Sequence, residues 1–362
     1  MNKLFNFFKI GLITLSLLFV STLSNAFELK GDPKPAFIFF NVVNDGGWVQ
    51  AFDEARKRME NDLGMKLPYV EKVPEVATEI RPAVKKFIQR GHNVIIGTAF
   101  GYSDTFLELA NEHPDVAFLN AAGTTNNEKN LVSYYGRTYE SQYLCGMVAG
   151  AMTKTNKIGF VAANPFGLVN WTVNAYLLGA RQMNPDVTLS VVYTGAWYDP
   201  VKERSSAEAL VEQGVDVIGQ HVDSPTPNVV AQEKGILGTG HHRDMSEFAG
   251  DSSVCSSVWV WDKYLTPALQ TISGGSWKPS AWGDFLSIKA GGTDIVLSDN
   301  VPKAVRDKVM AERQALIEGK HVFAGPIKDQ SGNIRVASGE VADDGALWGM
   351  DYLVEGVNGS LN

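Results

Sequence analysis

The stretch that decides the fold is FIFFNVVNDGGWVQAFDEARKRMENDL, residues 37–63. Its apolar start, Phe37 to Phe40, predicts a buried strand, and the Gly-containing loop from Asn44 to Gly47 ends that strand. Apolar residues then recur at the spacing of one helix face, at Phe52, Ala55, Met59 and Leu63. In an open α/β sheet such a strand–loop–helix junction lies at the carboxyl edge, where ligands bind. We therefore expect an α/β fold with a binding loop here.

The loop does not have the composition of a phosphate-binding loop. It contains neither GxGxxG nor GxxxxGK[ST], so neither a dinucleotide nor a nucleoside triphosphate is indicated. What remains is the flat ring of Trp48 beside Asn44 and Asp45. The alternative interpretation is that Asp45 only caps the helix and that Trp48 only covers the core.

The N-terminal 26 residues have the pattern of a secretory signal peptide. Lys3 and Lys9 form a short basic region, an apolar run follows over residues 10–23, and small residues stand at 24–26. We expect residues 27–362 to be exported to a periplasm. An acyl anchor would need a cysteine at the cleavage point, but the cysteines are Cys145 and Cys255, so we expect no membrane anchor.

Charge and length narrow the class of protein further. The formal charge is -8 and becomes -10 without Lys3 and Lys9, which argues against nucleic acid and anionic membranes as partners. The 336 residues that remain exceed one ordinary core and suggest two lobes. We expect the protein to be a monomer. Whether Cys145 and Cys255 pair in an oxidising compartment is left open, because sequence does not give their separation.

The second half of the chain repeats the first. GHNVII at 91–96 and GVDVIG at 214–219 stand 123 residues apart, each after an amphipathic helix and before a polar loop. We expect one lobe from residues 27–136 plus about 259–292, and the other from 137–258 plus about 293–362. No flexible linker separates them, so several crossings should form a hinge around a cleft.

The loops at the predicted strand ends share one composition, in which aromatic side chains stand beside carboxylates or amides. Two aromatic faces closing on a flat ring would bury it, while polar side chains bond its edge. For each aromatic residue the alternative is a plug in the core or hinge. Three other tryptophans, Trp277, Trp282 and Trp348, lie outside such loops and are expected to serve packing. The candidate ligand-binding residues are Asn44, Asp45, Trp48, Phe100, Tyr102, Phe166, Trp171, Trp197, Gln220, Asp244 and Trp261.

Signals for catalysis, metals and cofactors are weak. His241-His242 with Asp244, and His221 with Asp223, do not place several metal ligands on one helix face. The sequence contains no GxSxG and no SxxK motif, so it predicts a binding protein without a cofactor, rather than an enzyme. A hydrolase that uses Asp244 with a neighbouring histidine remains the alternative from another class.

With these residues assembled, the chain resembles the basic membrane protein family of substrate-binding proteins, whose best-known members serve ABC importers of purine nucleosides. The resemblance rests on five segments in order: NDGGW (44–48), FGYSDTFLELANEHPDVAF (100–118), YGRTYESQYLCGMVAGAMTKTNKIGFVAA (135–163), DPVKERSSAEALVEQGVDVIGQHVDSP (199–225) and FAGPIKDQSGNIR (323–335). It implies a type I periplasmic-binding-protein fold with two Rossmann-like lobes, and an ABC permease and ATPase as partners.

The resemblance also implies roles for individual residues. Trp48 takes the stacking position of the first lobe, and Phe166 or Trp171 that of the second. Asp45 or Asn44 bonds the ring edge, and Asp244 holds the acidic position after the sixth strand. Where nucleoside binders have a lysine for the sugar, this chain has Trp259-Val260-Trp261, which favours a free nucleobase or a related flat heterocycle. A sugar, an amino acid, or a sensor role in place of import remain alternatives.

Overall fold

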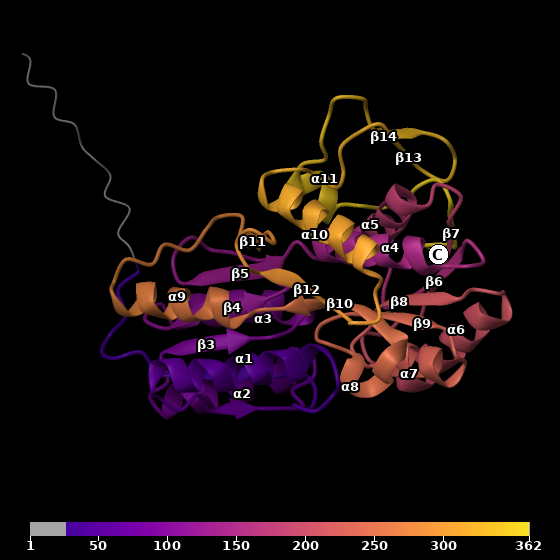
Figure 1. The fold of residues 1–362 in the computed structure, drawn as a ribbon. Helices are drawn as coiled ribbons and strands as arrows, with labels where there is room; N and C mark the ends of the chain where they lie inside the picture. Colours follow the sequence, from indigo (N-terminus) through magenta and orange to yellow (C-terminus); the bar gives the residue numbers. More distant parts are fainter. Residues whose placement is uncertain (1–26, 362) are drawn as a thin grey trace, which may run out of the picture.

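The computed structural model describes residues 27–361, so the predicted signal peptide lies outside the described residues. Two sheets lie side by side (Figure 1), and we call each sheet with its covering helices the first lobe and the second lobe. The first sheet has the order β11-β5-β4-β3-β1-β2 and is parallel throughout. Its strands are β1 (Pro35–Ile38), β2 (Tyr69–Val70), β3 (Val94–Gly97), β4 (Ala117–Ala121), β5 (Leu131–Gly136) and β11 (Asp284–Leu286).

The second sheet has the order β12-β10-β9-β8-β6-β7-β15, in which only the β10–β12 pair is antiparallel. Its core order, β7-β6-β8-β9-β10, repeats the order β2-β1-β3-β4-β5 of the first sheet. The two segments related by the offset of 123 residues lead into β3 and β8, which hold equivalent places. The strands are β6 (Lys157–Ala162), β7 (Thr188–Tyr193), β8 (Val217–His221), β9 (Leu237–Gly240), β10 (Ser253–Trp259), β12 (Thr293–Leu297) and β15 (Val357–Asn358).

Helices cover both faces of each sheet. In β1, Phe37 packs on the side of α1, whereas Ile38 packs on the side of α2 and α3, as alternation along a strand requires. Both faces are therefore buried, which is why these strands read as continuous apolar runs. The helices are α1 (Trp48–Leu63), α2 (Ala77–Gln89), η1 (Phe100–Tyr102), α3 (Ser103–Glu112), α4 (Thr138–Met152), α5 (Gly167–Met183), α6 (Pro200–Glu212), α7 (Thr226–Glu233), α8 (Ser246–Ala249), η2 (Gly250–Ser252), α9 (Asp262–Ser273), α10 (Lys303–Ile317) and α11 (Asp344–Trp348).

Within residues 27–361 the chain passes between the sheets three times: after β5, after β10, and between β11 and β12. The Ser141 hydroxyl lies 2.7 Å from that of Ser257 and 2.8 Å from that of Thr293, so one buried cluster joins the three crossing segments. A short hairpin of β13 (Ile327–Lys328) and β14 (Ile334–Val336) lies near α11 at the top of Figure 1. None of the described helices is long and apolar enough to cross a membrane.

Three details differ from the sequence-based expectation or were left open by it. β1 runs over Pro35–Ile38, so Phe40, expected inside the strand, lies in the following loop. Trp282, expected to pack, is 83% exposed in the loop before β11. Cys145 on α4 and Cys255 on β10 are buried free thiols, with their Sγ atoms 2.8 Å apart.

Candidate functional site

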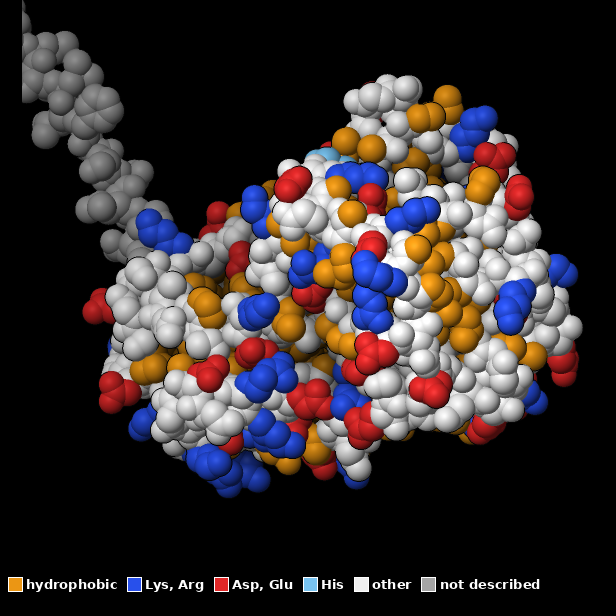
Figure 2. Space-filling view, viewed as in Figure 1, with side chains coloured by type: hydrophobic (Ala, Val, Ile, Leu, Met, Phe, Trp, Pro, Cys, Tyr) orange, Lys and Arg blue, Asp and Glu red, His pale blue; other side chains and the backbone are white. Residues whose placement is uncertain are grey.

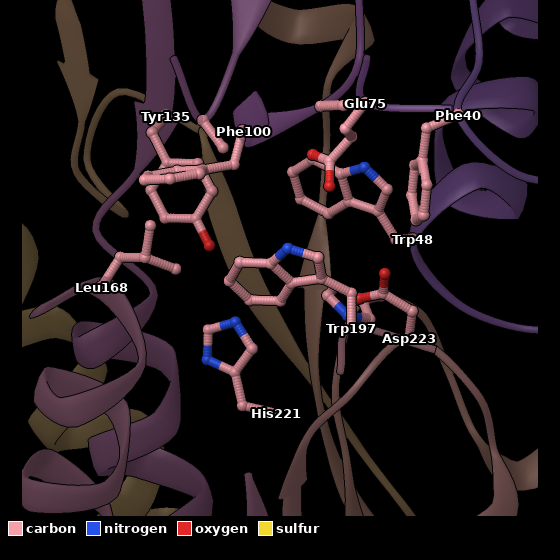
Figure 3. A pocket seen from close by; sticks show the side chains of 12 residues that line it. Phe40, Trp48, Glu75, Phe100, Tyr135, Leu168, Trp197, His221 and Asp223 are labelled. Atoms are coloured by element: carbon pink, nitrogen blue, oxygen red, sulfur yellow. The ribbon is translucent and has the colours of Figure 1, made fainter. Parts of the chain in front are cut away.

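A cavity lies where the carboxyl ends of the two parallel sheets face each other (Figure 3). Its atom-free space, including the opening to solvent, is about 350 Å³. The segments after β1, β2, β3 and β4, with Tyr135 of β5, form one side, and the segments that follow β6, β7, β8 and β9 form the other. The lining residues are Phe40, Trp48, Glu75, Ala99, Phe100, Ala122, Tyr135, Leu168, Trp197, His221, Asp223 and His242.

Aromatic rings from both lobes form the walls. Trp48, the first residue of α1, is fixed because its indole N–H donates to the Thr98 carbonyl at 2.7 Å. Phe100 of the first lobe and Trp197 of the second lie 6.3 Å apart between ring centres, and Figure 3 shows both rings facing the cavity. Phe166 stacks on Phe100 from the opposite lobe, at 5.4 Å and 16°. The cavity is thus enclosed by flat apolar surfaces from both sides.

Carboxyl groups from both lobes supply polar edges. Glu75 precedes α2 and accepts the Gly101 N–H at 2.7 Å, while burial raises its pKa. Asp223 follows β8, and burial raises the pKa of its carboxyl well above the usual range. Figure 3 shows the carboxyl of Glu75 beside the Trp48 ring and the Tyr135 hydroxyl pointing into the space. Lys and Arg are absent from the lining residues.

Three buried histidines, His221, His241 and His242, lie under the second-lobe side of the cavity, with neighbouring ring centres 4.0 and 4.3 Å apart. The Trp259 indole can only donate, so His242 Nδ1 accepts from it at 2.8 Å and Nε2 carries the proton, 3.0 Å from Asp223 Oδ1. Burial lowers the pKa of His242 to about 3, so this histidine is neutral.

The ring of His221 is fixed in a similar way. Its Nδ1 lies 2.9 Å from the Thr172 hydroxyl, which already donates to the Val169 carbonyl. Nδ1 of His221 is therefore the donor, and its other ring nitrogen is an acceptor. Among residues 27–361 no three His, Cys, Asp or Glu side chains are placed to hold a metal ion.

The diglycine of the first loop is where the lobes touch. Gly46 has φ of +84°, and a Cβ there would lie 2.6 Å from Pro225. A Cβ on Gly47 would overlap the carbonyl oxygen of Asp223. Nearby, Arg243 of the second lobe forms an ion pair with Glu54 of α1, at 2.8 Å. The closed arrangement therefore depends on the absence of side chains at these two positions.

Of the predicted residues, the structure places Trp48, Phe100 and Trp197 in the cavity lining, and Phe166 against its mouth. Asp45 lies beside the cavity but not in its lining: its carboxylate accepts the N–H groups of Gly47, Val49 and Gln50, and so caps α1. Burial raises the pKa of Asp45 to about 7. Asn44 is exposed at the surface.

The structure places five other predicted residues away from the cavity. Tyr102 is buried in the first lobe and donates to the Val73 carbonyl, and Gln220 bonds within its own loop. Trp171 is buried and donates to the Thr138 hydroxyl at 3.1 Å. Asp244 accepts the Ser246 N–H. Trp261 stacks on Phe52 at 4.6 Å and 8°. Each is used by its own surroundings, so we do not assign it to the ligand.

Sequence reasoning did not select several residues that line the cavity. Glu75 lies after a two-residue strand that has no clear pattern, and Tyr135 lies inside β5 rather than after it. His221, His242 and Asp223 are not among the predicted ligand-binding residues, although the sequence predicts structural or hydrogen-bonding histidines here and places Asp223 beside Gln220 in a loop after a strand. The signal that could have found Asp223 and His242 was their position directly after two buried strands. Phe40 and Leu168 are apolar and carry no such signal.

The comparisons with known proteins agree with this geometry. The family described as ABC transporter substrate-binding protein PnrA-like matches residues 33–331. The chain belongs to this family. A purine-binding protein of Brucella abortus is 35% identical over 334 residues, which cover 91% of this chain and 93% of that protein. A putative ABC transporter glucose-binding protein of Haloferax volcanii is 34% identical, over 90% of this chain and 80% of that one.

A solved structure shares the fold. The ABC transporter solute-binding protein of Conexibacter woesei superposes with a TM-score of 0.65 at 23% identity, over 79% of this chain and 97% of that one. The expected type I fold of periplasmic solute-binding proteins, with parallel-sheet lobes, is confirmed. The family consists of substrate-binding proteins of ABC transporters, so a solute, a permease and an ATPase are the partners of its members.

Proposed function

We propose that this protein is exported, captures a flat purine-like ligand between its lobes, and delivers it to an ABC importer without chemical change. The observation that carries the proposal is the cavity with aromatic walls from both lobes and carboxyl groups at its edges. A heteroaromatic ring buries both faces against such walls while its edge N–H groups meet acceptors. The purine-binding relative from Brucella abortus supports this ligand class.

Hinge closure would couple binding to delivery. A ligand that touches both walls only in the closed arrangement stabilises that arrangement by its differential affinity. The Ser141, Ser257 and Thr293 cluster lies among the three crossings and forms the fixed base of such a hinge. We further propose a monomer in the periplasm. Acidic and basic side chains are interspersed on the face in Figure 2, which fits a small-molecule binder better than a nucleic-acid binder.

A sugar is the second candidate, because one relative of similar identity is named a putative glucose-binding protein. Aromatic walls also stack on sugar faces. The two candidates differ in the polar contacts that they need: a sugar presents hydroxyls around its whole rim, whereas the cavity concentrates its polar groups at Glu75, Asp223, His221 and Tyr135. This distribution favours a heterocycle.

The test is isothermal titration calorimetry of residues 27–362 against purine bases, purine nucleosides, glucose and amino acids. We expect binding of a purine base, about tenfold to a hundredfold weaker in Trp48→Ala, and an intermediate affinity in Trp48→Phe, which keeps a flat ring. Thermal unfolding of both variants controls for loss of folding. Binding of glucose alone would replace the purine proposal with the sugar.

A further inference from the structure

Two acidic side chains from opposite lobes line the same cavity and lack a basic partner. Glu75 belongs to the first lobe and Asp223 to the second. The described Lys and Arg residues form no ion pair with either of them, and Asp223 lies instead 3.0 Å from Nε2 of the neutral His242. Elsewhere the lobes do use such pairs, as between Arg243 and Glu54. The contact between the lobes at the cavity thus lacks the cation that the Arg243–Glu54 contact contains.

The closed arrangement brings these two groups under each other's influence. Burial is the main cause of the raised pKa of Asp223, and the charge of Glu75 raises it further. Burial, and in addition the charge of Asp223, also raises the pKa of Asp45, so the closed arrangement opposes ionisation of this neighbouring carboxyl as well. The other titratable groups around Asp223 are Glu203, His221, His242 and Tyr135. None of these supplies a positive charge, since both histidines are held neutral by burial.

Closing the empty cleft is costly in either protonation state: ionised carboxylates repel each other and lose their hydration, whereas neutral ones must first take up protons that they would not hold in water. When the lobes separate, both carboxylates return to water and the repulsion is screened. The carboxyl pair thus raises the free energy of the closed, ligand-free state relative to the open state. A ligand that donates hydrogen bonds to both carboxylates removes this penalty.

We propose that Glu75 and Asp223 form a two-lobe acceptor pair that opposes closure of the empty cleft and selects a neutral or cationic ligand with N–H donors on two edges. The inference rests on the proposed function and deepens it. The aromatic walls accept flat rings of any charge, so Glu75 and Asp223 are the groups that discriminate between ligands by charge. An anionic ring of the same shape, such as urate at neutral pH, would add a third unpaired negative charge and is rejected.

The experiment compares Glu75→Gln and Asp223→Asn with the wild type. Glu79→Gln is the matched control, because Glu79 is an exposed acid in the first turn of α2, four residues from Glu75. One arm titrates adenine and urate by calorimetry. We expect the wild type to prefer adenine, and each pair variant to bind adenine about tenfold more weakly without losing affinity for urate. Equal affinity of the wild type for both rings, or an equal loss for both rings in the variants, would overturn the proposal.

The second arm uses no ligand and is independent of the ligand class. Small-angle X-ray scattering of the ligand-free proteins should give a smaller radius of gyration for Glu75→Gln and Asp223→Asn than for the wild type and Glu79→Gln, because the repulsion across the cleft is removed. An unchanged radius in both pair variants would contradict the pair's role in closure. If the wild type binds no purine at all, the proposed function fails while this arm still decides whether the pair opposes closure.

Discussion

Trp48 and Trp261 occupy similar positions in sequence but have different surroundings in the structure. Each stands at the start of a first-lobe helix, α1 or α9, and each has an acidic neighbour, Asp45 or Asp262. Their rings lie 5.6 Å apart at 83°. Trp48 lines the cavity and has its N–H bonded, whereas Trp261 lies between Phe52 and Trp259 with its buried N–H unpaired.

The difference shows that the pattern of an aromatic residue beside a carboxylate in a loop after a strand finds residues near the cavity. It does not show which of them line it. The same sequence pattern occurs at Trp48, whose ring lines the cavity, and at Trp261, whose ring lies in the aromatic stack behind it, next to the hinge. Only the neighbours brought by the opposite lobe distinguish the two. Variants that separate cleft closure, hinge packing and ligand contact therefore test the comparison directly.

The largest effect on binding is expected from Gly47→Ala. Its Cβ would overlap the Asp223 carbonyl oxygen, so the cleft cannot close to its full extent. We expect purine affinity to fall by about a hundredfold or more, about 2.7 kcal/mol, with little change in thermal stability. Calorimetry checks the affinity. Gly345→Ala, in α11 away from the cavity, is the control, and equal affinities of the two variants would show that the diglycine does not limit closure.

Trp261→Ala should have the largest effect on stability. Removing a fully buried tryptophan between two stacked rings leaves a cavity, and such substitutions cost about 3–5 kcal/mol. Urea unfolding measures this loss. Under conditions where the variant remains folded, its ligand affinity should stay within a few fold of the wild type, in contrast to Trp48→Ala. A stable variant that cannot bind would instead place Trp261 in the site.

The sequence predicted the parallel lobes and their repeated order because buried strands and amphipathic helices have strong periodicities. It also selected Trp48, Phe100 and Trp197, which line the cavity, because they stand in or just after the loops that follow strands. It could not separate them from Tyr102 or Trp171, because burial by a partner element tens of residues away leaves no local mark. Asp45 illustrates the same limit: helix capping and ligand binding require the same residue at the same place.

The two cysteines provide a test of the region next to the hinge, where Trp261 lies. Cys145 lies on α4 and Cys255 on β10, two elements that border the crossings, and their Sγ atoms lie 2.8 Å apart. In an oxidising compartment we expect a disulfide, formed as a thiol–disulfide oxidoreductase accepts two electrons and the two thiols lose their protons. It should add about 2–4 kcal/mol of stability without changing ligand affinity.

Intact-mass spectrometry of periplasmic material after alkylation under denaturing conditions counts the free thiols. The protein should resist alkylation until it is reduced, and its melting temperature should fall on reduction. The double variant Cys145→Ala, Cys255→Ala is the control, since reductant should not affect it. Two alkylated cysteines in unreduced material would show that the pair stays a dithiol.

A smaller effect is expected from pH. Glu203 lies behind Asp223 in the second lobe, contacts the Ser224 hydroxyl, and burial raises its pKa to about 7. As pH rises, the unfolded chain loses the Glu203 proton at a lower pH than the folded protein does, because the pKa is raised only in the folded protein. The stability that this proton contributes is therefore lost as pH rises through about 7. The melting temperature should be higher near pH 6 than near pH 8. Glu203→Gln should reduce this difference, and an unchanged pH profile would contradict the assignment.

The smallest effect is expected from Trp282→Ala, and this variant tests how large the ligand is. Trp282 is 83% exposed and lines an outer groove with Phe100, Phe166 and Asn126, next to the cavity. Its removal should change the free energy of unfolding by no more than about 0.5 kcal/mol and leave the affinity for a free base unchanged. A nucleoside whose sugar reached this groove would bind more weakly to the variant. Calorimetry with a base and its nucleoside therefore separates a ligand confined to the cavity from one that extends past Phe100.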